Sequence, residues 1–138
     1  MSARSNGSLL AILRSAGLRP TRQRLALARL LFDGRHRHVT AEALHAEATR
    51  AGAKLSLATV YNSLHQFTHA GLVKEVVVDA MRTYFDTNVA AHHHFFDEAD
   101  GRLADIPIDQ VSLGRLPVPP AGREIARVEV VIRVRKPA

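Results

Sequence analysis

The sequence contains no cysteine and no tryptophan, and aromatic residues make up only 5% of its 138 residues. Without cysteine the chain can form neither disulfide bonds nor thiolate metal sites. The core therefore has to be built mainly of leucine, valine, isoleucine and alanine. No apolar run approaches the roughly 18 residues that a membrane span requires, and the first residues show no secretory signal. We expect a cytoplasmic protein that does not enter a membrane.

The positive charge is concentrated in the first two thirds of the chain. Apolar residues (46%) and charged residues (23%) are in the range of an ordered globular protein. The formal net charge is +6; residues 1–90 hold ten arginines and two lysines against six acids, whereas residues 91–138 hold seven bases and seven acids. A local basic excess indicates a polyanionic partner, most often nucleic acid, with a solvated basic surface as the alternative.

Four helical patterns occupy the first half of the chain. The first runs from Ser8 or Leu9 to Ala16, and the other three follow residues that are typical N-caps: Thr21, Thr40 and Ser56. A strand-like run at 73–78 and a returning run at 82–85 then predict a hairpin. Helices followed by a hairpin are the order of a winged helix-turn-helix, in which the hairpin is the wing.

The remaining residues predict a second, smaller domain. Strands are expected at 92–96, 102–106 and 128–134, and in the last of these apolar and charged residues mostly alternate. Fewer than fifty residues bury little core alone, so a second copy is expected to complete it. The pattern predicts an α+β fold: a winged-helix domain (1–87), a hinge (88–91) and a small second domain (92–138).

The fourth predicted helix has a face of short neutral polar side chains. Leu57, Val60, Leu64 and Phe67 are spaced as one buried stripe, and no acid occurs between Gly52 and Lys74. A helix that enters the major groove needs donors and acceptors without carboxylates; a solvent-facing polar side is the alternative. The residues predicted to contact DNA are Arg19, Arg22, Arg24, Thr59, Tyr61, Asn62, Ser63 and Gln66. Arg35 and Arg37 also flank this unit.

Three consecutive histidines, His92, His93 and His94, are the most unusual feature of the second domain. Alternate side chains of a strand share a face, so His92 and His94 point together and His93 points away. Imidazoles with nearby carboxylates suit Zn, Mn or Fe(II), and imidazoles alone suit axial ligation of haem iron. A polar surface strand is the alternative.

Several motifs in order resemble the successive signatures of the ferric uptake regulator family. They are Leu18–Arg24, His38–Leu44, Leu57–Leu64, Ala70–Val73, His92–His94 and Gly101–Leu103. The resemblance implies a winged-helix DNA-binding domain (1–87) joined to a small α/β dimerisation and ligand-sensing domain (92–138). It also implies a homodimer on double-stranded operator DNA, and mainly repression. It also implies a regulatory metal site at the hinge, at His38, Asp86, His92, His94 and Asp105.

The chain also departs from the commoner family pattern. Asp97 and Asp100 stand where many relatives have the first cysteine pair of a structural zinc, so no four-cysteine zinc is expected. Asn62 replaces the usual arginine after the recognition tyrosine, which implies a different operator. The histidine run without cysteine is similar to the iron response regulators, which implies haem binding by His92, His93 and His94 and control of iron and haem genes.

Other functions remain open at this point. One is a Mn-, Zn- or Fe(II)-responsive family member in which haem plays no part. A remote one is a zinc hydrolase with three histidines and a carboxylate, for which the sequence offers no evident general base or nucleophile motif. A haem buffer that binds no DNA is the last, and the basic first domain argues against it. The expectation is a regulator, not an enzyme.

Overall fold

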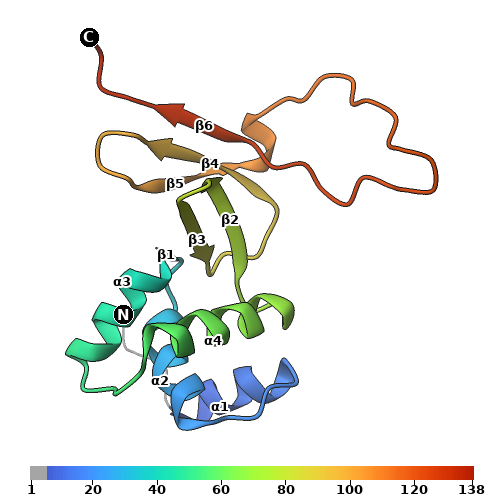
Figure 1. Ribbon diagram of the computed structural model, residues 1–138. Coiled ribbons are helices and arrows are strands. Elements are labelled where there is room, and N and C mark those ends of the chain that lie inside the picture. Colours follow the sequence, from blue (N-terminus) through green and yellow to red (C-terminus); the bar gives the residue numbers. More distant parts are fainter. Residues whose placement is uncertain (1–5) are drawn as a thin grey trace. The chain divides into compact units, whose positions relative to one another are not determined.

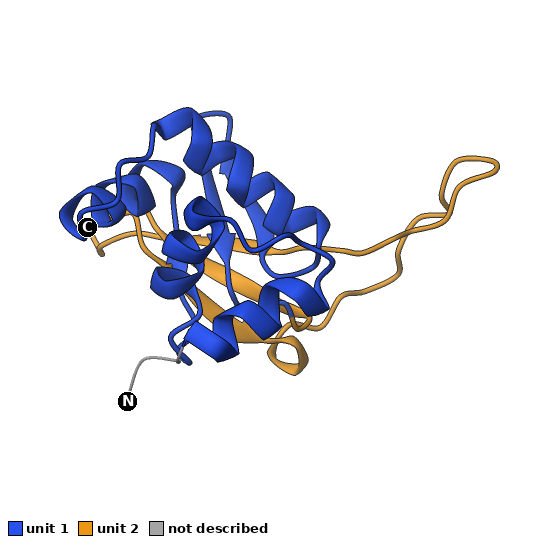
Figure 2. Ribbon diagram, turned by 90° about the horizontal axis from the view of Figure 1, so that it is seen from below, with its two compact units in different colours: residues 1–89 blue, residues 90–138 orange. Residues whose placement is uncertain are grey.

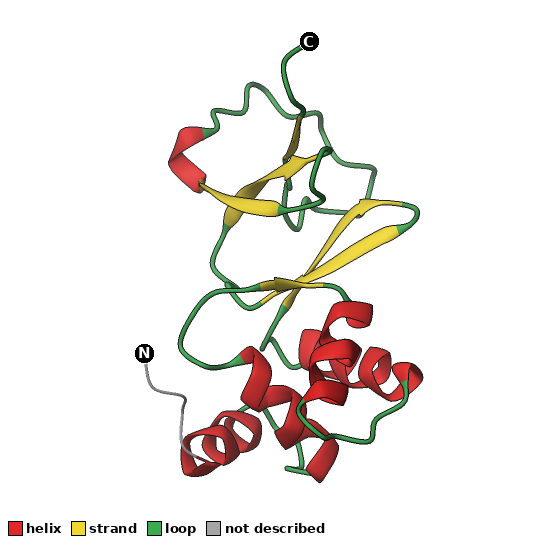
Figure 3. Ribbon diagram, turned by 90° about the vertical axis from the view of Figure 1, so that its left-hand side faces the viewer, coloured by secondary structure: helices red, strands yellow, loops and turns green. Residues whose placement is uncertain are grey.

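The computed structural model describes residues 6–138 and divides the chain into two compact units, the first ending at Val89 and the second spanning Ala90–Ala138 (Figure 2). The α-helices all belong to the first unit, and the second is built of strands, loops and one short helical turn (Figure 3). In the part of the chain that the structure describes, no helix has the length and apolar character of a membrane span.

The first unit begins with four helices: α1 (Asn6–Ser15), α2 (Arg22–Leu31), α3 (Ala41–Arg50) and α4 (Leu57–His69). The three predicted N-caps are confirmed. Thr21, Thr40 and Ser56 have extended backbones, and each side-chain oxygen accepts a hydrogen bond from the backbone N–H three residues later. These bonds satisfy donors that the first helical turn leaves without a partner.

The helices enclose the core of the first unit. Its buried members are mainly aliphatic, as the composition requires, and the two phenylalanines Phe67 and Phe85 are its largest side chains. In α3 the buried residues are Ala41, Leu44 and Ala48. Phe85 comes from the wing, so the hairpin is packed onto the helices by the same core.

A three-stranded sheet completes the first unit, in the order β1-β3-β2 (Figure 1). The predicted wing is confirmed as the antiparallel pair β2 (Lys74–Asp79) and β3 (Arg82–Asp86). The sequence pattern did not predict β1 (His38–Val39), a two-residue strand that pairs antiparallel with β3. Backbone and side-chain hydrogen bonds between Arg37 and Thr87 hold this strand at its N-terminal end.

The second unit is a three-stranded sheet in the order β5-β4-β6. Strand β4 (His92–Asp97) pairs antiparallel with β5 (Leu103–Pro107) and parallel with β6 (Val131–Val134). The one-turn helix η1 (Ile108–Gln110) follows β5. The predicted strand over 128–134 is corrected at its start, because the backbone N–H of Val130 donates to Nδ1 of His93 and the ladder begins only at Val131.

Candidate functional site

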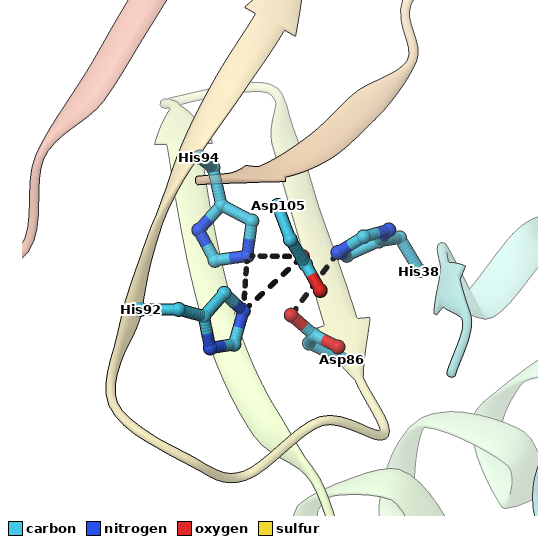
Figure 4. Close-up of side chains that lie close together, drawn as sticks. All are labelled: His38, Asp86, His92, His94 and Asp105. Carbon is cyan, nitrogen blue, oxygen red and sulfur yellow. Dashed lines mark hydrogen bonds and ion pairs between the residues drawn. The ribbon is translucent and has the colours of Figure 1, made fainter. Parts of the chain in front are cut away.

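The second unit brings His92, His94 and Asp105 together. His92 and His94 are two residues apart in β4, so they lie on one face of the sheet, and Asp105 is the cross-strand partner of His94 in β5. His92 and His94 are 6% and 4% exposed, and Asp105 is exposed to solvent. Figure 4 shows the three side chains converging.

The donor atoms of this set face one another. Nε2 of His92 is 2.9 Å from Nε2 of His94, and Oδ1 of Asp105 is 3.2 Å from the first nitrogen and 3.5 Å from the second. Nδ1 of His92 lies 2.6 Å from the carbonyl oxygen of Ala90, which only accepts, so Nδ1 carries the proton. In the neutral ring the lone pair of His92 is therefore on Nε2, the atom that faces His94 and Asp105.

This donor set fits a divalent metal ion. In a tetrahedral site with bonds of about 2.1 Å, neighbouring ligand atoms lie about 3.4 Å apart. The three separations in the second unit are close to that value. Two imidazole nitrogens and one carboxylate oxygen suit Zn, Mn or Fe(II). Three ligands leave at least one coordination position of such an ion to be filled.

His93 has a different environment from its two neighbours. It pairs with Ile106 in the strand register, it is 2% exposed, and its Nδ1 accepts the N–H of Val130. The prediction that His93 points away from His92 and His94 agrees with this position. Its hydrogen bond secures the start of β6.

The first unit contains a second pair of candidate ligands. His38 in β1 is the register partner of Asp86 in β3, and Nε2 of His38 is 3.1 Å from Oδ2 of Asp86. Asp86 is fully buried, and its Oδ1 accepts the backbone N–H of Asn88. A buried carboxylate is costly unless it is paired or binds a cation, so this pair also suits a metal ligand set. Figure 4 includes both residues.

The outer face of α4 is only partly as predicted. Asn62 and Gln66 are exposed and Thr59 is half-buried. Two predictions are corrected: Ser63 is 5% exposed and faces the core, whereas Leu57 is 37% exposed at the start of the helix. The buried positions are Val60, Ser63, Leu64 and Phe67. This stripe begins one turn later than the predicted stripe, and the short side chain of Ser63 fits within it.

Tyr61 is held by an acid from a neighbouring helix. Its hydroxyl donates to Oε1 of Glu42 at 2.6 Å, and its ring stacks on His65. The hydrogen bond from Tyr61 lowers the pKa of Glu42, and the same bond raises the pKa of Tyr61. Sequence reasoning missed Glu42 because it is 19 residues away; the only signal was its place in the first turn of a predicted helix.

The predicted DNA-contacting arginines have different environments. Arg19 and Arg22 are exposed, whereas Arg24 donates to the carbonyl of Arg19 and to Oε1 of Gln66. Arg35 forms an ion pair with Asp33, and Arg37 forms one with Glu47. These two pairs leave Arg35 and Arg37 less suited to neutralise phosphates than the exposed arginines.

Asp97 and Asp100 each bind the backbone of their own turn. Oδ1 of Asp97 accepts the N–H of Ala99, and Oδ1 of Asp100 accepts the N–H of Arg102. The two carboxylates therefore shape the turn between β4 and β5.

Comparisons with known proteins agree with these observations. The family model described as the ferric uptake regulator family matches residues 15–116. The peroxide-responsive repressor PerR of Staphylococcus aureus (strain Mu50 / ATCC 700699) is 35% identical over 103 residues, which cover 75% of this chain and 69% of that protein.

Solved structures are similar over nearly the whole chain. The ferric uptake regulator from Pseudomonas aeruginosa with manganese has a TM-score of 0.68 at 29% identity and covers 91% of this chain and 96% of its own. The Vibrio cholerae ferric uptake regulator has a TM-score of 0.71 at 23% identity and covers 92% of this chain and 98% of its own. At this identity the similarity supports the fold alone. The chain belongs to the ferric uptake regulator family of metal-responsive transcription regulators.

Proposed function

We propose that this protein is a DNA-binding regulator, mainly a repressor, of iron and haem genes, whose affinity for operator DNA is controlled by a ligand at its histidine-rich site. The first unit reads double-stranded DNA through α4 and the exposed arginines Arg19 and Arg22. The second unit pairs with a second copy and senses the ligand. The observation that carries the proposal is that each unit contains its own group of candidate metal ligands.

Each set alone is incomplete. His92, His94 and Asp105 supply three donor atoms, and His38 and Asp86 supply two. We propose that both sets bind one Mn, Zn or Fe(II) ion. A metal that draws ligands from both units binds one orientation of the DNA-reading unit better than others, and only such a difference can change DNA affinity.

The test separates metal binding from its effect on DNA. Calorimetry with Mn(II) and Zn(II) is run on the wild type and on His38→Gln, together with gel shifts on a duplex selected from a random pool. In His38→Gln we expect weaker metal binding and loss of the metal-dependent change in DNA affinity, with metal-free DNA binding unchanged. His36→Gln is the matched control, because His36 is exposed and two residues away.

The opposite result is equally clear. If His38→Gln keeps the full metal response, then His38 is not a ligand and the proposed coupling through it is wrong. If the metal-free wild type and the metal-bound wild type bind the duplex equally, then the site does not regulate DNA binding.

Haem is the second candidate ligand. What supports it is the run His92–His94 in a chain without cysteine, because imidazole is then the available strong axial ligand for haem iron. All three histidines are at most 6% exposed, so haem binding requires the residues that cover them to move aside. A divalent metal requires no such opening, because the donor atoms already converge.

A haem titration distinguishes the two ligands. Haem sensing predicts a histidine-type Soret band at about one haem per chain, a changed circular dichroism spectrum and loss of the gel shift. Replacement of His92, His93 and His94 by alanine then abolishes the response and leaves apo-protein DNA binding intact. No specific haem binding, with a gel shift that responds to Mn or Zn, assigns the protein to metal sensing alone.

A further inference from the structure

The side-chain amide of Gln66 in α4 has its oxygen engaged in hydrogen bonds within the first unit. Its Oε1 lies 3.2 Å from Nε and 2.9 Å from Nη2 of Arg24, so one guanidinium donates two hydrogen bonds to the same oxygen. A carbonyl oxygen has two lone pairs, and both are engaged here. The orientation of the amide is fixed by chemistry, because the opposite orientation sets its NH2 group against two N–H donors.

Arg24 is itself held in place. Its Nη1 donates to the carbonyl oxygen of Arg19 at 2.8 Å, so the guanidinium is fixed at three of its five N–H groups. Arg19 precedes α2 and Gln66 is in the last turns of α4. The contact therefore joins two parts of the first unit that are 42 residues apart, and it is charge-assisted.

Within residues 6–138, the side-chain groups of Gln66 and Arg24 that make no hydrogen bond are all N–H donors. They are the two N–H groups of Gln66 Nε2 and one N–H each on Nη1 and Nη2 of Arg24. A glutamine that reads adenine needs its oxygen to accept from the adenine amino group and its nitrogen to donate to N7. Gln66 cannot read adenine in that way while Arg24 occupies its oxygen.

We propose that Arg24 leaves Gln66 with only hydrogen-bond donors for base recognition. Gln66 therefore selects guanine over adenine at one position of each operator half-site. Guanine presents two adjacent acceptors, N7 and O6, in the major groove, whereas adenine presents one acceptor beside an amino donor. If adenine occupies this position, its amino group faces only the N–H donors of Gln66 and makes no hydrogen bond with them. Thymine offers the single acceptor O4 and ranks second. This inference rests on the proposed DNA-binding function of α4.

The experiment selects bound duplexes from a random pool with the full-length protein and reads base preference at each position. The wild type is expected to prefer guanine over adenine about tenfold at one position per half-site. Gln66→Glu keeps an oxygen for Arg24 and removes the amide donors, so the guanine preference should disappear at that position alone. Arg24→Met frees the oxygen of Gln66, so the preference should move from guanine to adenine.

Arg22→Met is the matched control. Arg22 lies in the same helix as Arg24, is exposed, and forms no hydrogen bond with Gln66. Its loss should weaken binding to all sequences and lower the salt dependence, with base preferences unchanged. Thermal melts followed by circular dichroism confirm that every variant is folded before selection.

Two results overturn the inference, and they are distinct from failure of the proposed function. If Arg24→Met binds more weakly but keeps guanine at every position, then Arg24 contacts phosphate only. If Gln66→Glu keeps the wild-type preferences, then Gln66 reads no base. If the wild type selects no sequence from the pool in either the presence or absence of metal, then the proposed regulator function fails first.

Discussion

The carbonyl oxygen of Ala90 selects the tautomer of the neutral His92 ring. The oxygen accepts a hydrogen bond from Nδ1 at 2.6 Å, and in the neutral ring Nε2 therefore carries the lone pair that faces His94 and Asp105. A backbone group just before β4 thus prepares a ligand atom before any metal arrives. Outer partners of this kind commonly change metal affinity by about 10- to 100-fold.

The tautomer of His92 is directly measurable. In metal-free protein at neutral pH, we expect nitrogen chemical shifts of the neutral His92 ring to show the proton on Nδ1. Addition of Zn(II) should then shift the Nε2 resonance and leave the Nδ1 proton in place. A proton on Nε2 in the neutral ring would contradict the arrangement described for this site.

Asp105→Asn should weaken metal binding without unfolding the protein. The substitution keeps the shape of the side chain, which is exposed at one edge, but replaces an anionic ligand by a neutral amide. We expect a loss of at least about tenfold in Mn(II) affinity by calorimetry. Asp109→Asn is the control, because Asp109 is an exposed acid of the same unit in η1. Equal effects of the two substitutions would mean that only the overall charge matters.

Thr40→Ala should destabilise the first unit. Thr40 caps α3, and its side-chain oxygen accepts the N–H of Ala43 at 3.1 Å. Loss of such a cap costs about 1 kcal/mol in the free energy of unfolding, which chemical denaturation can measure. Thr40→Ser keeps the hydroxyl and should stay close to the wild type. If serine and alanine are equally destabilising, then the methyl group, and not the cap, is the stabilising part.

Tyr61→Phe should raise the pKa of Glu42 towards its ordinary value, as measured by NMR titration. The pKa of Glu42 is lowered in the folded protein, so the hydrogen bond contributes stability above the ordinary glutamate range, and this contribution is lost as pH falls. The pKa of Tyr61 is raised, so its contribution is lost as pH rises through the alkaline range. Both groups are exposed enough that we expect a small effect on stability. An unchanged titration of Glu42 in Tyr61→Phe would show that the bond is absent in solution.

Phe95→Asp should make the protein monomeric. Phe95 in β4 is 39% exposed and is the register partner of Ile132 in β6, which is 38% exposed. Two adjacent apolar side chains on an open sheet favour a second copy as their cover, as proposed for this unit. Analytical ultracentrifugation measures the outcome. Val118→Asp is the control, because Val118 is 91% exposed in the loop and borders no strand. A dimer that survives Phe95→Asp would move the interface elsewhere.

The sequence predicted correctly those elements whose residues mark them within a few positions along the chain. The caps Thr21, Thr40 and Ser56 and the wing were predictable because capping and turn chemistry act over a few residues. The strand β1 was not, since two residues carry no periodicity. Ser63 was misplaced because a small hydroxyl side chain gives no sign of burial.

The candidate ligands depended on more than local pattern. Alternation predicted that His92 and His94 share a face, but the choice of Asp86 and Asp105 came from the family resemblance. The pairing of His38 with Asp86 follows from the β1–β3 register, and that of His94 with Asp105 follows from the β4–β5 register. Register is set by contacts between distant segments, which a single sequence does not display.

The parallel pairing of β6 with β4 has a consequence for how this protein can vary. Because β6 pairs with β4 on the side opposite β5, no tight turn can join β5 to β6, and the chain must cross over β4 between Pro107 and Val131. The crossover is rich in proline and glycine, and its length affects stability only slowly, by about 0.6 kcal/mol for each doubling. Insertions, deletions and grafted peptides are therefore tolerated best in this connection, which makes it the natural place to attach a label without disturbing His92, His94 or Asp105.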